Sequence, residues 1–116
     1  MDISQPLPEK LSVTELYLTT RRSWEACLAD FYRDDWTRMA DHTTRMGELA
    51  NRWKAEKPPE NLANEFNAAT AGFEAAVAEL KKNVEEKNVN GVTEAMRALG
   101  KRIDAFEAMR QTPPPK

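Results

Sequence analysis

Apolar residues recur three or four positions apart along most of this 116-residue chain. The pattern is clearest in the segment 92–110, which reads VTEAMRALGKRIDAFEAMR. Since an α-helix has about 3.6 residues per turn, side chains at this spacing share one face. The segment is therefore predicted to form an amphipathic helix with one apolar stripe, made of Val92, Met96, Leu99, Ile103 and Phe106.

The same spacing occurs in three earlier segments, and short links separate all four. Ser12 and Glu15 have the spacing of a capping box at the first helix start, and Asn90 is a predicted N-cap for the last helix. The predicted helices span about 12–31, 35–55, 59–87 and 90–110. Because short links join antiparallel neighbours, the sequence predicts an all-α, up-down-up-down four-helix bundle.

The expected inner stripe of the first helix consists of Val13, Tyr17, Thr20, Trp24, Cys27 and Phe31, with Leu16 and Leu28 beside it. Proline separates the bundle from both ends of the chain. Pro6 and Pro8 predict a loose lead over 1–11, and three successive prolines predict a disordered or extended tail over 111–116. The length suits one domain over 12–110.

Charge and hydropathy exclude several classes of partner. There are 17 basic and 19 acidic residues, and no segment gathers basic side chains into a stripe, so nucleic acid is not expected as a ligand. No apolar run is long enough to span a bilayer, so no membrane insertion is expected. The start, MDISQPLPEK, has no apolar stretch typical of a signal peptide, which leaves a cytoplasmic location open.

Most metal and catalytic sites need more histidine and cysteine than this chain has. His42 and Cys27 are its single histidine and single cysteine. A tetrahedral zinc site, a di-iron site and a hydrolytic triad each need a larger set of side chains. With four glycines there is also no glycine-rich phosphate loop. We therefore expect the protein not to be an enzyme, and Cys27 to pack as a small apolar residue in the core.

One candidate metal site lies on the second predicted helix. Met39, His42 and Met46 fall within about 60° of one another around a helix, and soft sulfur ligands suit Cu(I). The alternative interpretation places both methionines in the core and His42 at the boundary of the bundle.

Three segments, taken in order, resemble the cytochrome c-prime family. RRSWEACLADFYRDDWTRMADHTTRMGELA is similar to its first two helices, and KPPE with the alanine-rich segment after it is similar to its second connection and third helix. NVNGVTEAMRALGKR is similar to the run that leads into the family's haem motif, Cys-x-x-Cys-His. The resemblance implies a four-helix bundle from a haem-binding lineage.

Carried onto this chain, the two haem cysteines of the family correspond to Ile103 and Phe106, and its histidine corresponds to Glu107. Ile103 and Phe106 cannot form thioethers, and a carboxylate is a poor substitute for the imidazole ligand of haem iron. We therefore expect no cofactor and a haem site filled by side chains, among them Phe106 and Phe73. Glu107 is expected at the bundle boundary, with a buried acid in a vestigial pocket as the alternative.

The expected function is that of a haem-free bundle with a non-catalytic binding or assembly role. The resemblance implies a homodimer formed through the first two helices and a periplasmic location. One alternative is an electron-transfer or gas-binding haem protein with unusual, non-covalent ligation. A second alternative is a copper-binding protein that uses Met39, His42 and Met46.

Overall fold

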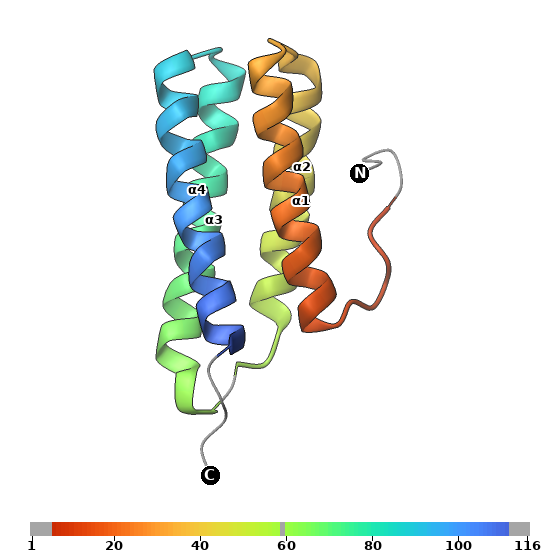
Figure 1. Ribbon diagram of the computed structural model, residues 1–116, viewed down its shortest axis with the longest axis vertical. Helices are drawn as coiled ribbons and strands as arrows, with labels where there is room; N and C mark the ends of the chain where they lie inside the picture. Colours follow the sequence, from red (N-terminus) through yellow and green to blue (C-terminus); the bar gives the residue numbers. More distant parts are fainter. Residues whose placement is uncertain (1–5, 59, 112–116) are drawn as a thin grey trace.

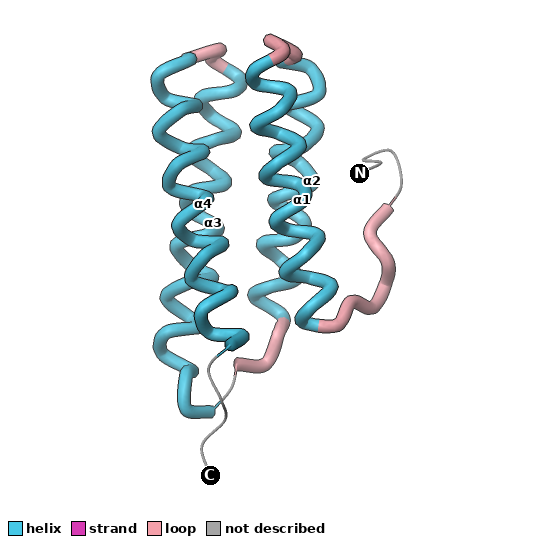
Figure 2. The backbone as a smooth tube through the Cα atoms, viewed as in Figure 1, coloured by secondary structure: helices cyan, strands magenta, loops and turns pink. Residues whose placement is uncertain are grey.

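The computed structural model describes residues 6–58 and 60–111, and their side chains as far as residue 109. It contains four α-helices: α1 (Val13–Tyr32), α2 (Trp36–Ala55), α3 (Ala63–Glu85) and α4 (Val89–Gln111). A short 3₁₀ helix, η1 (Glu60–Leu62), precedes α3. The described residues contain no strand (Figure 2), so the all-α, four-helix prediction is confirmed. No helix among them is long and apolar enough to cross a membrane.

The helices lie side by side in an elongated molecule of 49 × 28 × 18 Å. Figure 1 shows that successive helices run in opposite directions and that each link turns the chain at one end of the bundle. Each helix packs mainly against its neighbours in the sequence, and α1 also contacts α4. This contact between α1 and α4 is the least extensive of the four helix–helix contacts.

Local hydrogen bonds explain where α1 and α2 begin. Ser12 Oγ accepts a hydrogen bond from the Glu15 backbone N–H, and Glu15 Oε1 accepts one from the Ser12 backbone N–H, both at 3.1 Å. This is the predicted capping box. At the next turn Asp34 has a φ of 60°, and the Asp35 carboxylate accepts from the Arg38 backbone N–H at 3.1 Å. The second aspartate is therefore the one that caps α2.

The starts of α3 and α4 differ from the prediction. The single turn of η1 comes first, so α3 begins at Ala63, about four residues later than expected, and no side chain caps it. At the last link Lys87 adopts a φ of 52°, and Asn88 Oδ1 accepts from the Gly91 backbone N–H at 3.0 Å. Asn88, and not Asn90, therefore caps α4, because Lys87 completes the reversal earlier than expected.

The described part of the N-terminal lead, residues 6–11, lies against the bundle without forming a helix. Leu7 and Leu11 are half-buried against the core, and Arg52 Nη1 of α2 donates to the Glu9 carbonyl at 3.0 Å. Gln111 is the last residue of α4, and the rest of the predicted tail lies outside the described residues.

All four helices contribute to one hydrophobic core. The α4 stripe is buried as predicted, with each of its five side chains at most 2 % exposed. On α1, however, Leu16 is 1 % exposed whereas Val13 is 43 % exposed. The inner face of the first turn of α1 therefore differs from the predicted stripe, because Leu16 points into the core in place of Val13.

Candidate functional site

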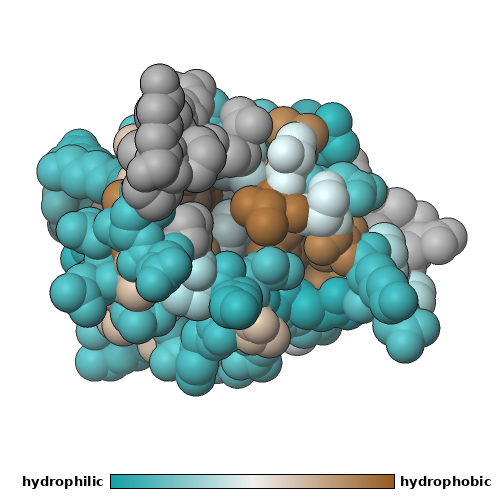
Figure 3. Space-filling view, turned by 90° about the horizontal axis from the view of Figure 1, so that it is seen from below, coloured by the Kyte–Doolittle hydropathy of each residue, from teal (hydrophilic) through white to brown (hydrophobic). Residues whose placement is uncertain are grey.

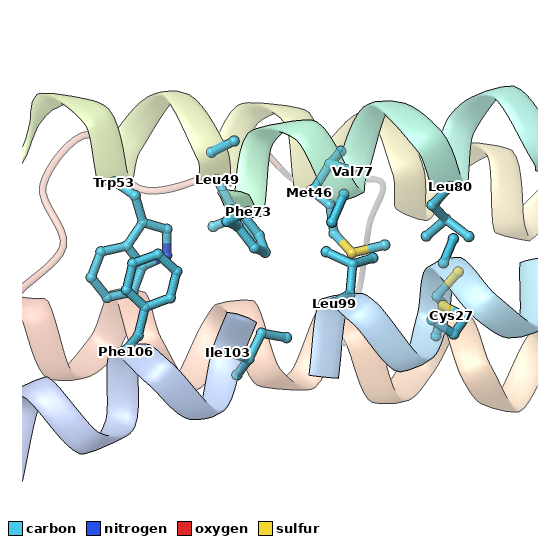
Figure 4. Packing of buried hydrophobic residues seen from close by; sticks show 14 of the residues in the cluster. Cys27, Met46, Leu49, Trp53, Phe73, Val77, Leu80, Leu99, Ile103 and Phe106 are labelled. Carbon is cyan, nitrogen blue, oxygen red and sulfur yellow. The ribbon is translucent and has the colours of Figure 1, made fainter. Parts of the chain in front are cut away.

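Ile103 and Phe106, which the resemblance aligns with two haem cysteines, lie on the inner face of α4. Ile103 is 1 % and Phe106 2 % exposed. The Phe106 ring stacks on the Trp53 indole of α2, with ring centroids 4.0 Å apart and planes only 2° from parallel. Figure 4 shows the two rings overlapping across the core, with Ile103 beside them on α4.

Two more aromatic rings from α3 surround this stack. Phe73 meets the Phe106 ring edge-on at 5.7 Å, and Phe66 meets it tilted at 6.3 Å. Trp53 Nε1 donates to Thr20 Oγ1 of α1 at 3.0 Å, and this hydroxyl donates to the Leu16 carbonyl at 2.7 Å. The buried indole N–H therefore has its hydrogen-bond partner, and side chains from all four helices occupy the region around Phe106.

Glu107 follows Phe106 on α4 and is half-buried at the edge of the inner face. This placement agrees with a boundary carboxylate. It disagrees with the alternative of an acid enclosed in a pocket.

The three candidate copper ligands all lie inside the molecule. Met39, His42 and Met46 are each 0 % exposed. The methionines are core residues, but the expected boundary position of His42 is wrong. His42 is buried because Asp30 of α1 lies opposite it, with Asp30 Oδ2 at 2.8 Å from His42 Nε2. A buried imidazole with a carboxylate partner does not need to reach solvent.

Asp30 joins the C-terminal part of α1 to the first turns of α2 and is not among the candidate residues predicted from the sequence. Its carboxylate is buried, and besides His42 it has Arg38 Nε at 3.5 Å and Arg33 Nη1 at 3.7 Å. These cations offset part of the cost of removing the carboxylate from water. Helical spacing indicates that Asp30 is buried, because it follows Thr20, Ser23 and Cys27 on the inner face of α1.

The other ring nitrogen of the histidine, His42 Nδ1, is buried and makes no hydrogen bond within the described residues. The same residues contain no group of three or more histidine, cysteine, aspartate or glutamate side chains arranged for a metal ion. A metal at His42 would therefore depend on methionine sulfur.

Cys27 is completely buried on α1. Burial, with a smaller contribution from the negative charge of Asp30, raises the pKa of its thiol from 9.0 to about 12. The reactive thiolate form is therefore strongly disfavoured at neutral pH. This agrees with the expected role of Cys27 as an apolar core residue.

The seam between α1 and α4 carries a groove with an aromatic lining. Its walls enclose about 310 Å³ and comprise Trp24, Leu28, Phe31, Tyr32, Thr93, Met96 and Arg97. Trp24 Nε1 donates to the Met96 carbonyl at 2.8 Å. Next to it, Gly100 brings α4 close to the indole, since a Cβ atom at this glycine would lie 3.1 Å from Trp24 Cζ2.

Other surface features are less aromatic. A groove of about 510 Å³ between α3 and α4 is lined mainly by glycine and alanine, and the Arg102 guanidinium lies over Gly72 there. A groove of about 410 Å³ between α2 and α3 has a mixed polar lining. At the lower end of the bundle, hydrophobic residues reach the surface among hydrophilic side chains (Figure 3).

The fold and this interior define a class of protein: a four-helix bundle with an aromatic core and a buried histidine–aspartate pair. Comparison with protein-family models, curated proteins and solved structures finds no match to this chain.

Proposed function

We propose that this protein is a haem-free four-helix bundle with a non-catalytic role in binding or assembly, and that it acts as a homodimer whose contact includes α1. The observation that carries the proposal is the stack of Phe106 on Trp53. In the family that the sequence resembles, haem attaches at this place on the last helix. Here aromatic side chains fill it, which supports a protein that works through its surface.

The histidine–aspartate pair also supports a non-catalytic role. An imidazole held by a carboxylate is the base and orienting group of many hydrolases. His42, however, is 0 % exposed, and a general base has to come within hydrogen-bond distance of its substrate. The buried Cys27 thiol is likewise closed to substrate and protonated at neutral pH. The pair therefore acts as a structural link between α1 and α2.

Haemin titration tests the proposal against the haem alternative. Absorption is recorded from 350 to 700 nm while haemin is added to the purified protein, with bovine serum albumin as a positive control for binding. We expect no Soret band that shifts and saturates at one haem per chain. Such a saturating band would overturn the proposal and favour an electron-transfer or gas-binding haem protein. His42 would then be the first residue to substitute.

Copper binding is a second candidate function, which one observation favours. His42 Nε2 pairs with a carboxylate while Nδ1 is unpartnered within the described residues. Metal-bound histidines commonly donate their second N–H to a carboxylate in this way. Met39 and Met46 are on the same face of α2 and supply soft sulfur atoms.

A competition experiment separates copper binding from the main proposal. Cu(I) is offered to the protein in the presence of a coloured Cu(I) chelator, and the variant Met39→Leu/Met46→Leu serves as a control of similar core volume. We expect both proteins to leave the chelator fully loaded. Removal of one equivalent of Cu(I) by the wild type, but not by the variant, would favour the copper function.

A further inference from the structure

The outward face of α1 carries a regular stripe of its own. Its positions are spaced three, four, three, four and three residues apart, and we call them the outer stripe: Glu15, Leu18, Arg22, Glu25, Ala29 and Tyr32. Ala29 is half-buried and the other five are exposed. Leu18 is 39 % and Tyr32 79 % exposed. Helices that pack along one another in coiled coils show this alternating three- and four-residue spacing at their contact positions.

The stripe is complementary to itself when two copies run antiparallel. If a two-fold axis passes between positions 23 and 24, each residue faces the residue of the other copy whose number brings the sum of the two residue numbers to 47. Arg22 of each copy then faces Glu25 of the other, so that two opposite-charge pairs flank the axis. Leu18 faces Ala29 on either side, which sets a large side chain against a small one. An isologous contact requires this kind of self-complementarity.

The charges that would pair in this arrangement are available. Arg22 is exposed and takes part in no ion pair among the residues that the structure describes. Glu25 has one partner, Arg21 Nε at 3.2 Å, and its side chain is 56 % exposed. A carboxylate has about four lone-pair sites and can accept a second guanidinium. In the dimer, Glu25 of one copy therefore pairs with Arg22 of the other copy, which gives Arg22 an acidic partner.

The stripe continues into the groove between α1 and α4. Leu28 and Tyr32 line this groove, and the 20 residues of α1 extend over about 30 Å. The facing edge of α4 widens this surface to about two helix diameters. Each copy therefore offers roughly 600 Å² of surface for contact. Two such faces bury about 1,200 Å², which reaches the lower limit of specific, stable interfaces.

We infer that α1 is the self-docking helix of this protein, and that two copies pair antiparallel along the outer stripe with Arg22 of each copy against Glu25 of the other. The inference rests on the proposed assembly role, and it adds the surface, the register and the residues that pair. It assigns the contact to α1 and the edge of α4, whereas the resemblance implies α1 and α2.

Charge reversal with rescue tests the pairing. Sedimentation velocity over a concentration series gives the dimer dissociation constant of the wild type, Arg22→Glu, Glu25→Arg and the double variant. Each single reversal creates two like-charge pairs across the axis, so we expect dissociation constants at least about tenfold larger. The double variant restores opposite charges, and we expect it to return to within about threefold of the wild type. Lys82→Glu on α3, an exposed reversal on another helix, serves as the matched control.

Disulfide trapping tests the register. In Leu18→Cys/Ala29→Cys the two introduced thiols are about 16 Å apart along one helix, too far for an internal disulfide. In the inferred dimer each introduced thiol faces one on the other copy. Mild oxidation should therefore yield a covalent dimer from this variant but not from Leu18→Cys alone. Cys27 does not interfere, because it is buried.

The possible failures of the two proposals are distinguishable. A wild-type protein that sediments as a monomer at every concentration overturns both the homodimer and the surface assigned to it. A wild-type dimer that neither charge reversal weakens, or that oxidation does not trap, overturns only the surface and register and leaves the assembly role standing.

Discussion

Phe106 lies at the centre of the aromatic cluster in the core. Its ring contacts rings from α2 and α3 and stacks almost parallel to Trp53. Offset and edge-on aromatic pairs contribute beyond the area that they bury. The residue is also the position where the resemblance would place a haem cysteine. The Phe106 ring packs in the core and has no sulfur atom with which to form a thioether.

Phe106→Ala should be among the most destabilising substitutions in the chain. Removing a buried phenylalanine leaves a cavity and costs about 3–5 kcal/mol of unfolding free energy. Chemical denaturation monitored by circular dichroism measures this loss. Leu18→Ala, at an exposed position, should stay within about 0.5 kcal/mol of the wild type. Equal losses for the two variants would contradict the packing described.

Cys27 should be inert in the folded protein. Since its pKa is raised to about 12, a thiol-reactive reagent at pH 8 should modify the denatured chain at least about a hundredfold faster than the native one. Mass spectrometry of samples quenched over time measures both rates. Fast labelling of the native protein would show that the thiol is accessible.

The same pKa predicts a pH dependence of stability. The folded protein holds the thiol proton more tightly than the unfolded chain, so the contribution of Cys27 to stability is complete below pH 9 and declines as the pH rises from 9 towards about 12. The stability of Cys27→Ala should therefore fall less than that of the wild type as the pH rises above 9. Denaturation midpoints at pH 8 and pH 10.5 compare the two proteins.

Local hydrogen bonds fix the helix starts, and a buried histidine–aspartate pair links α1 to α2. The capping box fixes the start of α1, and Asp35 fixes the start of α2. The Asp30–His42 pair then links the two helices just beyond the tight turn that joins them. Local caps decide where α1, α2 and α4 begin, whereas the buried pair restricts how α1 and α2 slide along each other.

Asp30→Ala should destabilise the α1–α2 hairpin strongly. The change leaves His42 buried without its carboxylate, and loss of one partner of a buried pair costs about 3–5 kcal/mol. Asp30→Asn keeps an oxygen that can accept from His42 and should cost less than Asp30→Ala. Denaturant unfolding at one fixed pH ranks the variants. An equal loss in both would mean that the oxygen opposite His42 is unimportant.

Two glycines inside helices make a matched test of helix packing. A Cβ atom at Gly47 of α2 would have no neighbour within 4 Å, so Gly47→Ala should stabilise the protein by about 0.5–1 kcal/mol. At Gly100 of α4 the same methyl group would press on the Trp24 indole at 3.1 Å. Gly100→Ala should therefore lose that gain or become destabilising. Thermal unfolding compares the two, and equal stabilisation would contradict the close contact at Gly100.

At the scale of the whole molecule, the bundle has one packed core and a surface groove between α1 and α4. Every helix contributes to one core, but α1 and α4 meet less extensively than the other adjacent pairs. The aromatic groove lies along this seam, and the outer stripe of α1 borders it. A filled interior and a self-complementary outer face together support a protein that functions through association.

Most of the secondary structure could be predicted from the sequence because its causes are local. The capping box needs only residues three positions apart, and the α4 stripe needs only helical periodicity. The cap of α2 is local as well, because Asp35 accepts from the backbone N–H of Arg38, three residues later. The misplaced starts of α3 and α4 have local causes too, a 3₁₀ turn and the positive φ of Lys87, but neither has a strong signal in residue type.

The sequence by itself determined four amphipathic helices separated by short links and the absence of a Cys-x-x-Cys-His motif, because residue identity and spacing are enough for these conclusions. Only the tertiary structure decided what surrounds each inner side chain. His42 is buried because Asp30 on another helix pairs with it, and Phe106 closes the core because it meets Trp53, 53 positions earlier. Such contacts depend on how the helices are rotated and staggered against one another, and periodicity within one helix carries no information about its neighbour.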